Sequence, residues 1–251
     1  MIDDIYYVGG SVGSFLITSD EGHILIDTVY PEYGSFILKG ILDLGFNPRD
    51  IKYIAITHAH FDHTGSAMML AEATGAQICI GEVDREAAEK GSERQPPIKI
   101  DKSLKDGDVI ALGDKEIRVY HTPGHTAGNI SFDFKIAHEG RVLNGFLIGG
   151  FAVRSSTAPA RYEGALQDYT KTLDRLESLK VDVWFVSHPE PSDIFGKFEF
   201  LRRGGKPNPF IDPEGWKAFL KTLRGSLVDG KEVGPASFPI YTKERPYFLK
   251  T

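Results

Sequence analysis

The chain has 251 residues, a formal net charge of −6 and an ordinary globular composition, with 41% hydrophobic and 25% charged residues. The negative charge and the lack of a basic run argue against nucleic acid as the main partner. The single cysteine, Cys79, excludes an intramolecular disulfide bond. It stands in the apolar run AQICI, which predicts a buried structural thiol.

The N-terminal segment MIDDIYYVGG carries acidic residues where a signal peptide would carry basic ones. No run approaches the ~20 apolar residues of a membrane helix. The sequence as given therefore predicts a cytoplasmic protein without membrane association. A processed chain of this sequence would instead be periplasmic or secreted.

Short β-rich segments predict three strands in the first thirty residues, IYYVGG, SFLITS and HILIDT. Apolar residues at helical spacing then predict a helix that ends at Gly45. The apolar run IKYIAIT (51–57) predicts a strand buried on both faces. A short helix closed by Gly75 and the strand AQICIG follow.

In the second half, residues 84–102 predict a helix end followed by an exposed loop, and residues 108–134 predict three strands. VLNGFLIGG and VDVWFVS predict two further strands, on either side of an amphipathic helix over 164–179. A last helix begins near Pro213. No segment rich in Gly, Ser or Pro divides the chain, so we expect one α/β domain over 1–251.

Three loops that each follow a predicted strand carry side chains suited to metal binding. These loops are THAHFDH, TPGHTAGN and SHPEP. Ligands collect at the carboxyl ends of strands, and imidazole and carboxylate groups without thiolate suit zinc or another borderline divalent ion. The residues that could converge there are His58, His60, Asp62, His63, His125 and His188.

Isolated histidines need no metal to explain them. His23 and His138 have no ligand-like neighbours, so we expect ordinary core or surface positions. His121 precedes the TPGH loop and is a weaker candidate for a partner of the metal ligands. In contrast, three histidines and an aspartate within six residues bring no packing advantage and leave many polar groups to satisfy. A metal centre is the better interpretation of HAHFDH.

The three motifs, in this order, resemble those of the metallo-β-lactamase fold superfamily. His125 follows His63 by 62 positions, and His188 follows His125 by 63. The likeness covers most of the chain, and the segment RRGGKPNPFIDPEGWKAFL is most similar to the third, histidine-rich subclass (B3) of class B β-lactamases. The resemblance implies an αββα sandwich with a metal site at one edge.

The resemblance also implies a division of the ligands between two zinc ions. One ion would be held by His58, His60 and His125, and the other by Asp62, His63 and His188.

Many superfamily members add a bridging aspartate on the strand after TPGH. The matching position in this chain is Gly149 or Gly150. That departure is expected for the third β-lactamase subclass and counts against glyoxalase-like and lactonase-like hydrolases. The second ion would have only three protein ligands, so we expect it to bind less tightly.

The activity that the resemblance implies is that of a dinuclear zinc hydrolase. It would use a metal-bound hydroxide to open a cyclic amide, with a β-lactam ring as the leading substrate. Asp62 would be the catalytic residue, because it can orient the hydroxide and carry its proton.

The loop 150–163 is expected to position the small-molecule substrate. The third subclass usually supplies serine hydroxyls at the start of this loop, where the present chain has Phe151 and Val153. We therefore expect β-lactam hydrolysis to be weak. The candidate substrate-binding residues are Arg154, Ser155, Ser156 and Tyr162.

Three alternatives remain open at this stage. The same fold could hydrolyse another ester, thioester or amide. A single iron with two histidines and one carboxylate could support an oxygenase, although six intact ligands fit two metals better. A binding protein on an inactive scaffold agrees less well with a complete ligand set. Metal content separates these classes: about two zinc, about one iron, or none.

Overall fold

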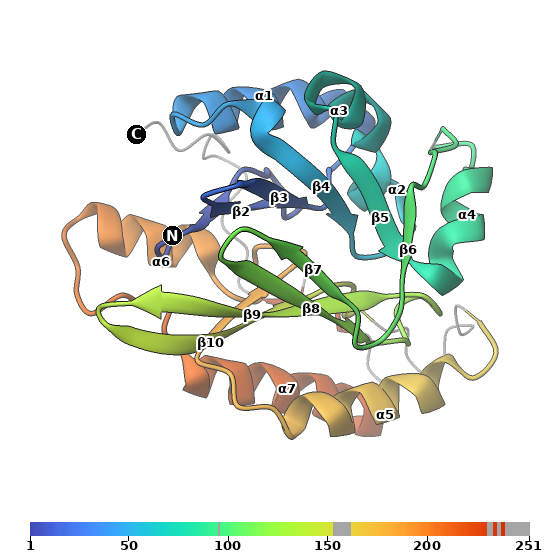
Figure 1. Ribbon diagram of the computed structural model, residues 1–251. Helices are drawn as coiled ribbons and strands as arrows, with labels where there is room; N and C mark the ends of the chain where they lie inside the picture. Colours follow the sequence, from blue (N-terminus) through green and yellow to red (C-terminus); the bar gives the residue numbers. More distant parts are fainter. Residues whose placement is uncertain (95, 153–161, 230–232, 235–236, 239–251) are drawn as a thin grey trace.

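Two β-sheets stack face to face at the centre of the structure, and helices cover the outer face of each (Figure 1). The computed structural model describes residues 1–94, 96–152, 162–229, 233–234 and 237–238. In this part of the chain the layers follow the order helix, sheet, sheet, helix. The predicted αββα sandwich is therefore confirmed.

The first sheet contains the N-terminal strands, which hydrogen-bond in sequence order. β1, β2 and β3 are antiparallel neighbours, whereas β3, β4, β5 and β6 run parallel. β3 and β4 are apolar along most of their length because both faces of this sheet are covered. The strands are β1 (Ile5–Tyr7), β2 (Phe15–Ser19), β3 (Gly22–Ile26), β4 (Ile51–Ile56), β5 (Gln77–Gly81) and β6 (Lys102–Leu104).

The second sheet has the order β11-β10-β9-β8-β7. Its neighbours are antiparallel except β10 and β11, which run parallel. The strands are β7 (Val109–Leu112), β8 (Lys115–His121), β9 (Ile130–His138), β10 (Arg141–Ile148) and β11 (Val183–Val186).

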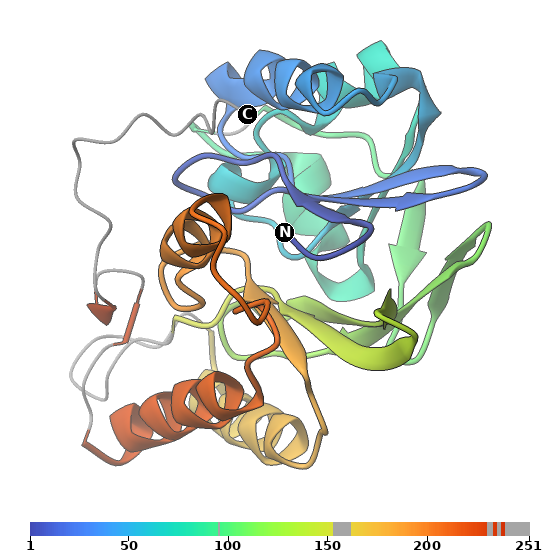
Figure 2. The same ribbon diagram turned by 90° about the vertical axis from the view of Figure 1, so that its left-hand side faces the viewer.

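Helices α1 and α3 lie on the first sheet, and α5 and α7 lie on the second (Figures 1 and 2). The helices of the described chain are α1 (Gly34–Asp43), α2 (Phe61–Thr64), α3 (Ala67–Thr74), α4 (Arg85–Lys90), α5 (Ala165–Glu177), α6 (Ile194–Arg202) and α7 (Pro213–Asp229). Single 3-10 turns are η1 (Pro31–Tyr33), η2 (Pro48–Asp50) and η3 (Glu82–Asp84).

Buried apolar side chains fill the three spaces between these layers. Alternate residues of β9, including Phe132, Phe134 and Ile136, join the core between the two sheets. A second core lies under α1 and α3. The third lies under α5 and α7, where Tyr169 and Leu173 of α5 are buried at the spacing that the sequence predicts.

The structure adds three elements that the sequence pattern does not predict: α2, β6 and α6. Ile194, Phe198 and Leu201 of α6 recur at helical spacing, which is the signal that could have found this helix, although only Ile194 is buried. The Asp193 side chain caps it by accepting a hydrogen bond from the backbone N–H of Gly196. β6 is only three residues long. α2 is a single turn that begins inside the HAHFDH motif.

The strand topology brings the three motif loops to one edge of the sandwich. The HAHFDH loop follows β4, the TPGH loop follows β8, and SHPE follows β11. Cys79 is fully buried on β5, as expected, and burial raises its pKa to about 11. No helix of the described residues is long and apolar enough to cross a membrane.

Candidate metal centre

Six side chains from these loops gather in two groups of three. Within each group the candidate ligand atoms lie within 4.8 Å of one another. The first group is His58, His60 and His125, and the second is Asp62, His63 and His188. The short helix α2 explains the division, because it begins after His60 and turns the next two ligands to the second group.

The first group has the spacing of a tetrahedral zinc site. The Nε2 atom of His125 lies 3.1 Å from Nε2 of His58 and 3.1 Å from Nδ1 of His60. Zinc–nitrogen bonds of 2.0–2.1 Å give ligand separations of about 3.3 Å around a tetrahedral ion. His58 is fully buried and His125 is 7% exposed, so this group is largely shielded from water.

Hydrogen bonds assign the tautomer of His58. Thr57 donates its only hydroxyl proton to Oδ2 of Asp27, at 2.8 Å. The hydroxyl oxygen of Thr57 can then only accept from Nδ1 of His58, at 2.9 Å. Nδ1 therefore carries the ring proton, and Nε2 of neutral His58 presents a lone pair to the first group. Burial, followed by the charges of neighbouring histidines, holds the pKa of His58 well below its ordinary value.

The same reasoning applies to His125. Its Nδ1–H donates to the carbonyl oxygen of Ala152 at 2.6 Å, so Nε2 of the neutral ring carries no proton. When both rings are neutral, the Nε2 lone pairs of His58 and His125 face each other at 3.1 Å. A cation between them converts this repulsion into coordination, so the residues fit a bound metal ion.

The second group is more open to solvent. Oδ2 of Asp62 lies 3.5 Å from Nε2 of His63 and 3.7 Å from Nε2 of His188. The side chains of Asp62 and His188 are 17% and 19% exposed, whereas that of His63 is 1% exposed. A substrate or water molecule can therefore reach this group more easily than the first.

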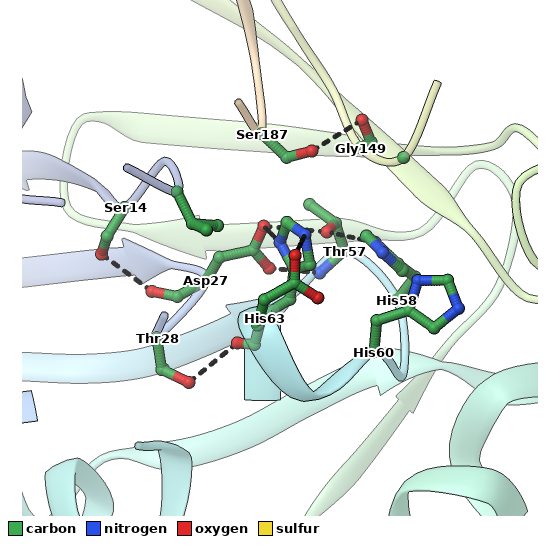
Figure 3. A network of polar contacts seen from close by, with 12 residues as sticks. Ser14, Asp27, Thr28, Thr57, His58, His60, His63, Gly149 and Ser187 are labelled. Atoms are coloured by element: carbon green, nitrogen blue, oxygen red, sulfur yellow. Dashed lines mark hydrogen bonds and ion pairs between the residues drawn. The ribbon is translucent and has the colours of Figure 1, made fainter. Parts of the chain in front are cut away.

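One buried carboxylate, Asp27, supports both groups (Figure 3). Its Oδ2 accepts from Nδ1–H of His63 at 2.8 Å and from the hydroxyl of Thr57. Its Oδ1 accepts from the backbone N–H of Thr57 at 2.8 Å. Asp27 thus fixes the ring of His63 directly and that of His58 through Thr57, with both Nε2 atoms directed to metal positions.

Asp27 also sets the ionisation of the second group. Burial alone would lower the pKa of His63, but the charge of Asp27 and hydrogen bonds to Asp27 and Asp62 raise it to about 10. Burial would raise the pKa of Asp62, but His63 and His188 hold it below its usual range. Burial and the charge on His63 lower the pKa of His188 to about 4. At neutral pH and without a metal ion, His63 therefore carries a proton on Nε2, the atom that would bind the second ion.

The position of the missing bridging carboxylate has no room for a side chain. A Cβ atom on Gly150 would overlap the ring carbons Cγ and Cδ2 of His125 and lie 2.8 Å from its Nε2. A Cβ on Gly149 would overlap the carbonyl oxygen of Ile130 and lie 2.6 Å from Oδ1 of Asn129. The backbone of this turn packs directly against the candidate ligand His125, so a metal ion here would have no carboxylate ligand from this position.

The residues expected to bind substrate are only partly described. Arg154, Ser155 and Ser156, as well as Val153, lie outside the described residues. Tyr162 donates its hydroxyl proton to Oδ2 of Asp168 on α5, at 3.2 Å.

Phe151 is 2% exposed, and its ring packs on Phe219 and Phe238 and lies 6.4 Å from that of His188. It therefore brings an apolar ring, and no hydroxyl, to the side of the second group.

The remaining histidines belong to neither group of candidate ligands. His23 is buried, and its Nδ1 has no hydrogen-bond partner among the described residues. His138 pairs with Asp3 at 2.8 Å, away from the metal centre. His121 donates from Nε2 to the carbonyl oxygen of Ala127 at 2.8 Å, which braces the loop that carries His125.

Sequence reasoning missed Asp27 and Thr57. Each stands at the carboxyl end of a strand that leads into the metal centre, in ILIDT and IAIT. That placement is the signal that could have found them.

The pKa of His63 leads to a testable prediction. Because the folded, metal-free protein keeps His63 protonated below pH ~10, an ion entering the second group must displace one proton. We expect the zinc affinity of this group to rise about tenfold per pH unit near neutrality, with one proton released per ion. Calorimetry in buffers of different ionisation enthalpy measures this release.

The matched control is Asp27→Asn, which removes the charge that raises the pKa of His63 and should reduce the proton release. An affinity of the second group that is equal at about pH 6 and about pH 8 would contradict the assignment.

Comparison with known proteins agrees with this geometry. The sequence model of the metallo-β-lactamase superfamily matches residues 7–188. A hydroxyacylglutathione hydrolase of Cereibacter sphaeroides is 36% identical over 227 residues, which cover 80% of this chain and 82% of the relative. One of Maricaulis maris is 25% identical over 193 residues, covering 76% of this chain and 66% of the relative.

Solved structures resemble the fold closely. A subclass B3 metallo-β-lactamase of Bradyrhizobium japonicum superposes with a TM-score of 0.83 at 33% identity, covering 90% of this chain and 89% of the other. The metallo-β-lactamase FEZ-1 of Legionella gormanii gives a TM-score of 0.85 at 28% identity, covering 90% and 92%. The family match, the fold and the two histidine-rich groups together show that this chain belongs to the metallo-β-lactamase superfamily and is a metal-dependent hydrolase.

Proposed function

We propose that the chain is a dinuclear zinc hydrolase that opens cyclic amides, with a β-lactam ring as the leading substrate. Residues 1–251 act as a single hydrolase domain. The first ion is held by His58, His60 and His125. The second is held by Asp62, His63 and His188.

The observation that carries this proposal is the packing of Gly150 against the ring of His125. It supports a two-metal site without a bridging carboxylate, the arrangement expected of the third β-lactamase subclass. The structural neighbours support the same assignment, since they include a subclass B3 enzyme that matches 90% of this chain.

The residues of the chain have separate tasks in this reaction. Two bound zinc ions would supply Lewis acidity and a hydroxide nucleophile at neutral pH. Asp62 is already ionised at that pH in the metal-free protein. It would stay ionised with zinc bound, so its carboxylate can orient the attacking water and take up its proton. Asp27 and Thr57 keep the ligand rings in place throughout.

A thioester is the second candidate substrate. The curated relatives named above are hydroxyacylglutathione hydrolases, and one is 36% identical to this chain. A thioester carbonyl needs the same polarisation and the same nucleophile as a lactam carbonyl, so the metal centre alone does not separate the two substrates.

The experiment that tests the proposal has two steps. Metal analysis of the purified protein should give about two zinc per chain, whereas about one iron would favour an oxygenase. A hydrolysis screen of the zinc form should then cover β-lactams, lactones and glutathione thioesters. Turnover of thioesters with no turnover of β-lactams would replace the first substrate by the second.

The role of Asp62 can be tested by Asp62→Ala. The variant should lose turnover, because one residue supplies both a metal ligand and the proton acceptor, while thermal unfolding stays cooperative. Steady-state kinetics on the best substrate of the screen measures the loss. Activity within about tenfold of the parent, which is a loss of less than about 1.4 kcal/mol of transition-state stabilisation, would refute this role.

We expect β-lactam hydrolysis to be weak. The apolar ring of Phe151 next to His188 cannot donate a hydrogen bond to the carboxylate of the substrate, and desolvating an unpaired carboxylate is costly. Kinetics on a penicillin, a cephalosporin and a carbapenem, with zinc occupancy confirmed first, measure this. A kcat/KM above about 10⁶ M⁻¹s⁻¹ on any of them would show the expectation to be wrong.

A further inference from the structure

Asp84 is a buried carboxylate that belongs to neither group of ligands. It ends the turn η3 after β5 and is 6% exposed. In Figure 1, β5 leads into α4 at the end of the sheet where α2 lies. An aspartate directly before a helix usually caps it by accepting hydrogen bonds from the first turn. In the described part of the chain, the carboxylate of Asp84 makes no such bond to α4.

The carboxylate instead joins the two loops that carry the first group of ligands. Its Oδ2 accepts from the backbone N–H of Ala59 at 2.9 Å, and Ala59 stands between His58 and His60. The same oxygen accepts from the hydroxyl of Thr126 at 2.8 Å.

The second oxygen of Asp84 reaches the same loop. Oδ1 accepts from the backbone N–H of Gly128 at 2.8 Å. Thr126 directly follows the ligand His125, and Gly128 lies two residues further on. Asp84 therefore binds both loops of the first group, at positions next to the ligands.

Two glycines allow this close approach. A Cβ on Gly128 would overlap the backbone nitrogen of Asp84 and lie 2.7 Å from its Cβ. A Cβ on Gly81, at the end of β5, would overlap the carbonyl oxygen of Gly128. The backbone of β5 and the TPGH loop thus pack with no space for side chains, and any shift of Asp84 moves the loop of His125.

We propose that Asp84 is a positioning residue that fixes the distance between the HAHFDH and TPGH loops and so sets the zinc affinity of the first group. This inference rests on the proposed metal centre. Only a carboxylate suits the task, because three donors point at one side chain and a carboxylate offers acceptors on both oxygens. An amide would present an N–H group to one of these donors.

The inference predicts a selective effect on metal binding. Asp84→Ala should weaken zinc binding by the first group about 10- to 100-fold, the usual loss when a partner that supports the ligands is removed. The second group should change by less than about threefold, because Asp27 orients His63 and no ligand of this group lies next to a hydrogen-bond partner of Asp84. Stepwise zinc affinities, from competition with a chelator, measure both without any substrate.

Two further measurements separate positioning from a general loss of stability. In cobalt-substituted protein, the visible bands of the first group should change in Asp84→Ala, because they report ligand geometry. On the best substrate, kcat should fall while KM stays within about threefold of the parent. The matched control is Glu86→Ala, which removes an exposed carboxylate from α4, the helix that follows Asp84, and should leave all three measurements unchanged.

A second variant decides the case if Asp84→Ala does not unfold cooperatively. Thr126→Val removes one of the three hydrogen bonds and keeps the shape of the side chain, so it should weaken the first group in the same direction but less. Unchanged affinity in Thr126→Val, or equal weakening of both groups in folded Asp84→Ala, would overturn the proposal. A parent protein that binds zinc but hydrolyses no cyclic amide would count against the proposed function alone.

Discussion

The metal centre depends on the buried carboxylate of Asp27 at the end of β3. It is 1% exposed, and its two oxygens accept hydrogen bonds from the backbone and hydroxyl of Thr57 and from the ring of His63. A buried carboxylate without such partners would be strongly destabilising. The backbone of Asp27 adopts a positive φ of 60°, a conformation that aspartate tolerates better than most residues, and Ser14 donates to its carbonyl oxygen. The first sheet thus holds the carboxylate where both metal groups need it.

One consequence is that the ligands are arranged before any ion binds. The Nδ1–H groups of His58 and His125 each donate a hydrogen bond to the surrounding protein, so the Nε2 atoms of the neutral rings present lone pairs to the same point. Asp27 likewise fixes the ring of His63 through Nδ1, although His63 is protonated at neutral pH until a metal ion binds. Repulsion between these lone pairs raises the free energy of the folded, metal-free protein. A bound cation removes this repulsion. The metal is therefore expected to stabilise the sandwich by joining loops from both sheets.

The sequence predicts most of the fold and names the six candidate ligands that the structure gathers in two groups, because both depend on local patterns. Strand and helix periods follow from burial, and HAHFDH concentrates ligands within one loop. The strand-end position of Asp27 marks it as a candidate, but the roles of Asp27 and Asp84 depend on contacts that no local pattern shows. Their hydrogen-bond partners lie 25 or more positions away along the chain. These are Thr57 and His63 for Asp27, and Ala59 and Gly128 for Asp84. The helix α6 differs, because its apolar residues Ile194, Phe198 and Leu201 do recur at helical spacing, so a local pattern was present.

The chain resembles two kinds of hydrolase, and the packing around Gly150 bears on the choice between their substrates. Hydroxyacylglutathione hydrolases and class B3 β-lactamases both resemble this chain, so the sandwich and the histidine-rich groups do not by themselves choose a substrate. Gly150 does constrain the choice, because its backbone lies against His125 where a side chain would collide with that ligand. A bridging carboxylate could enter only if the turn after β10 moved away from the metal centre. That turn is held by Asn129, which accepts from the N–H of Gly150 and donates to its carbonyl oxygen. Conversion to a carboxylate-bridged site would therefore require coordinated changes in at least two loops, and a single substitution at Gly150 would instead displace His125.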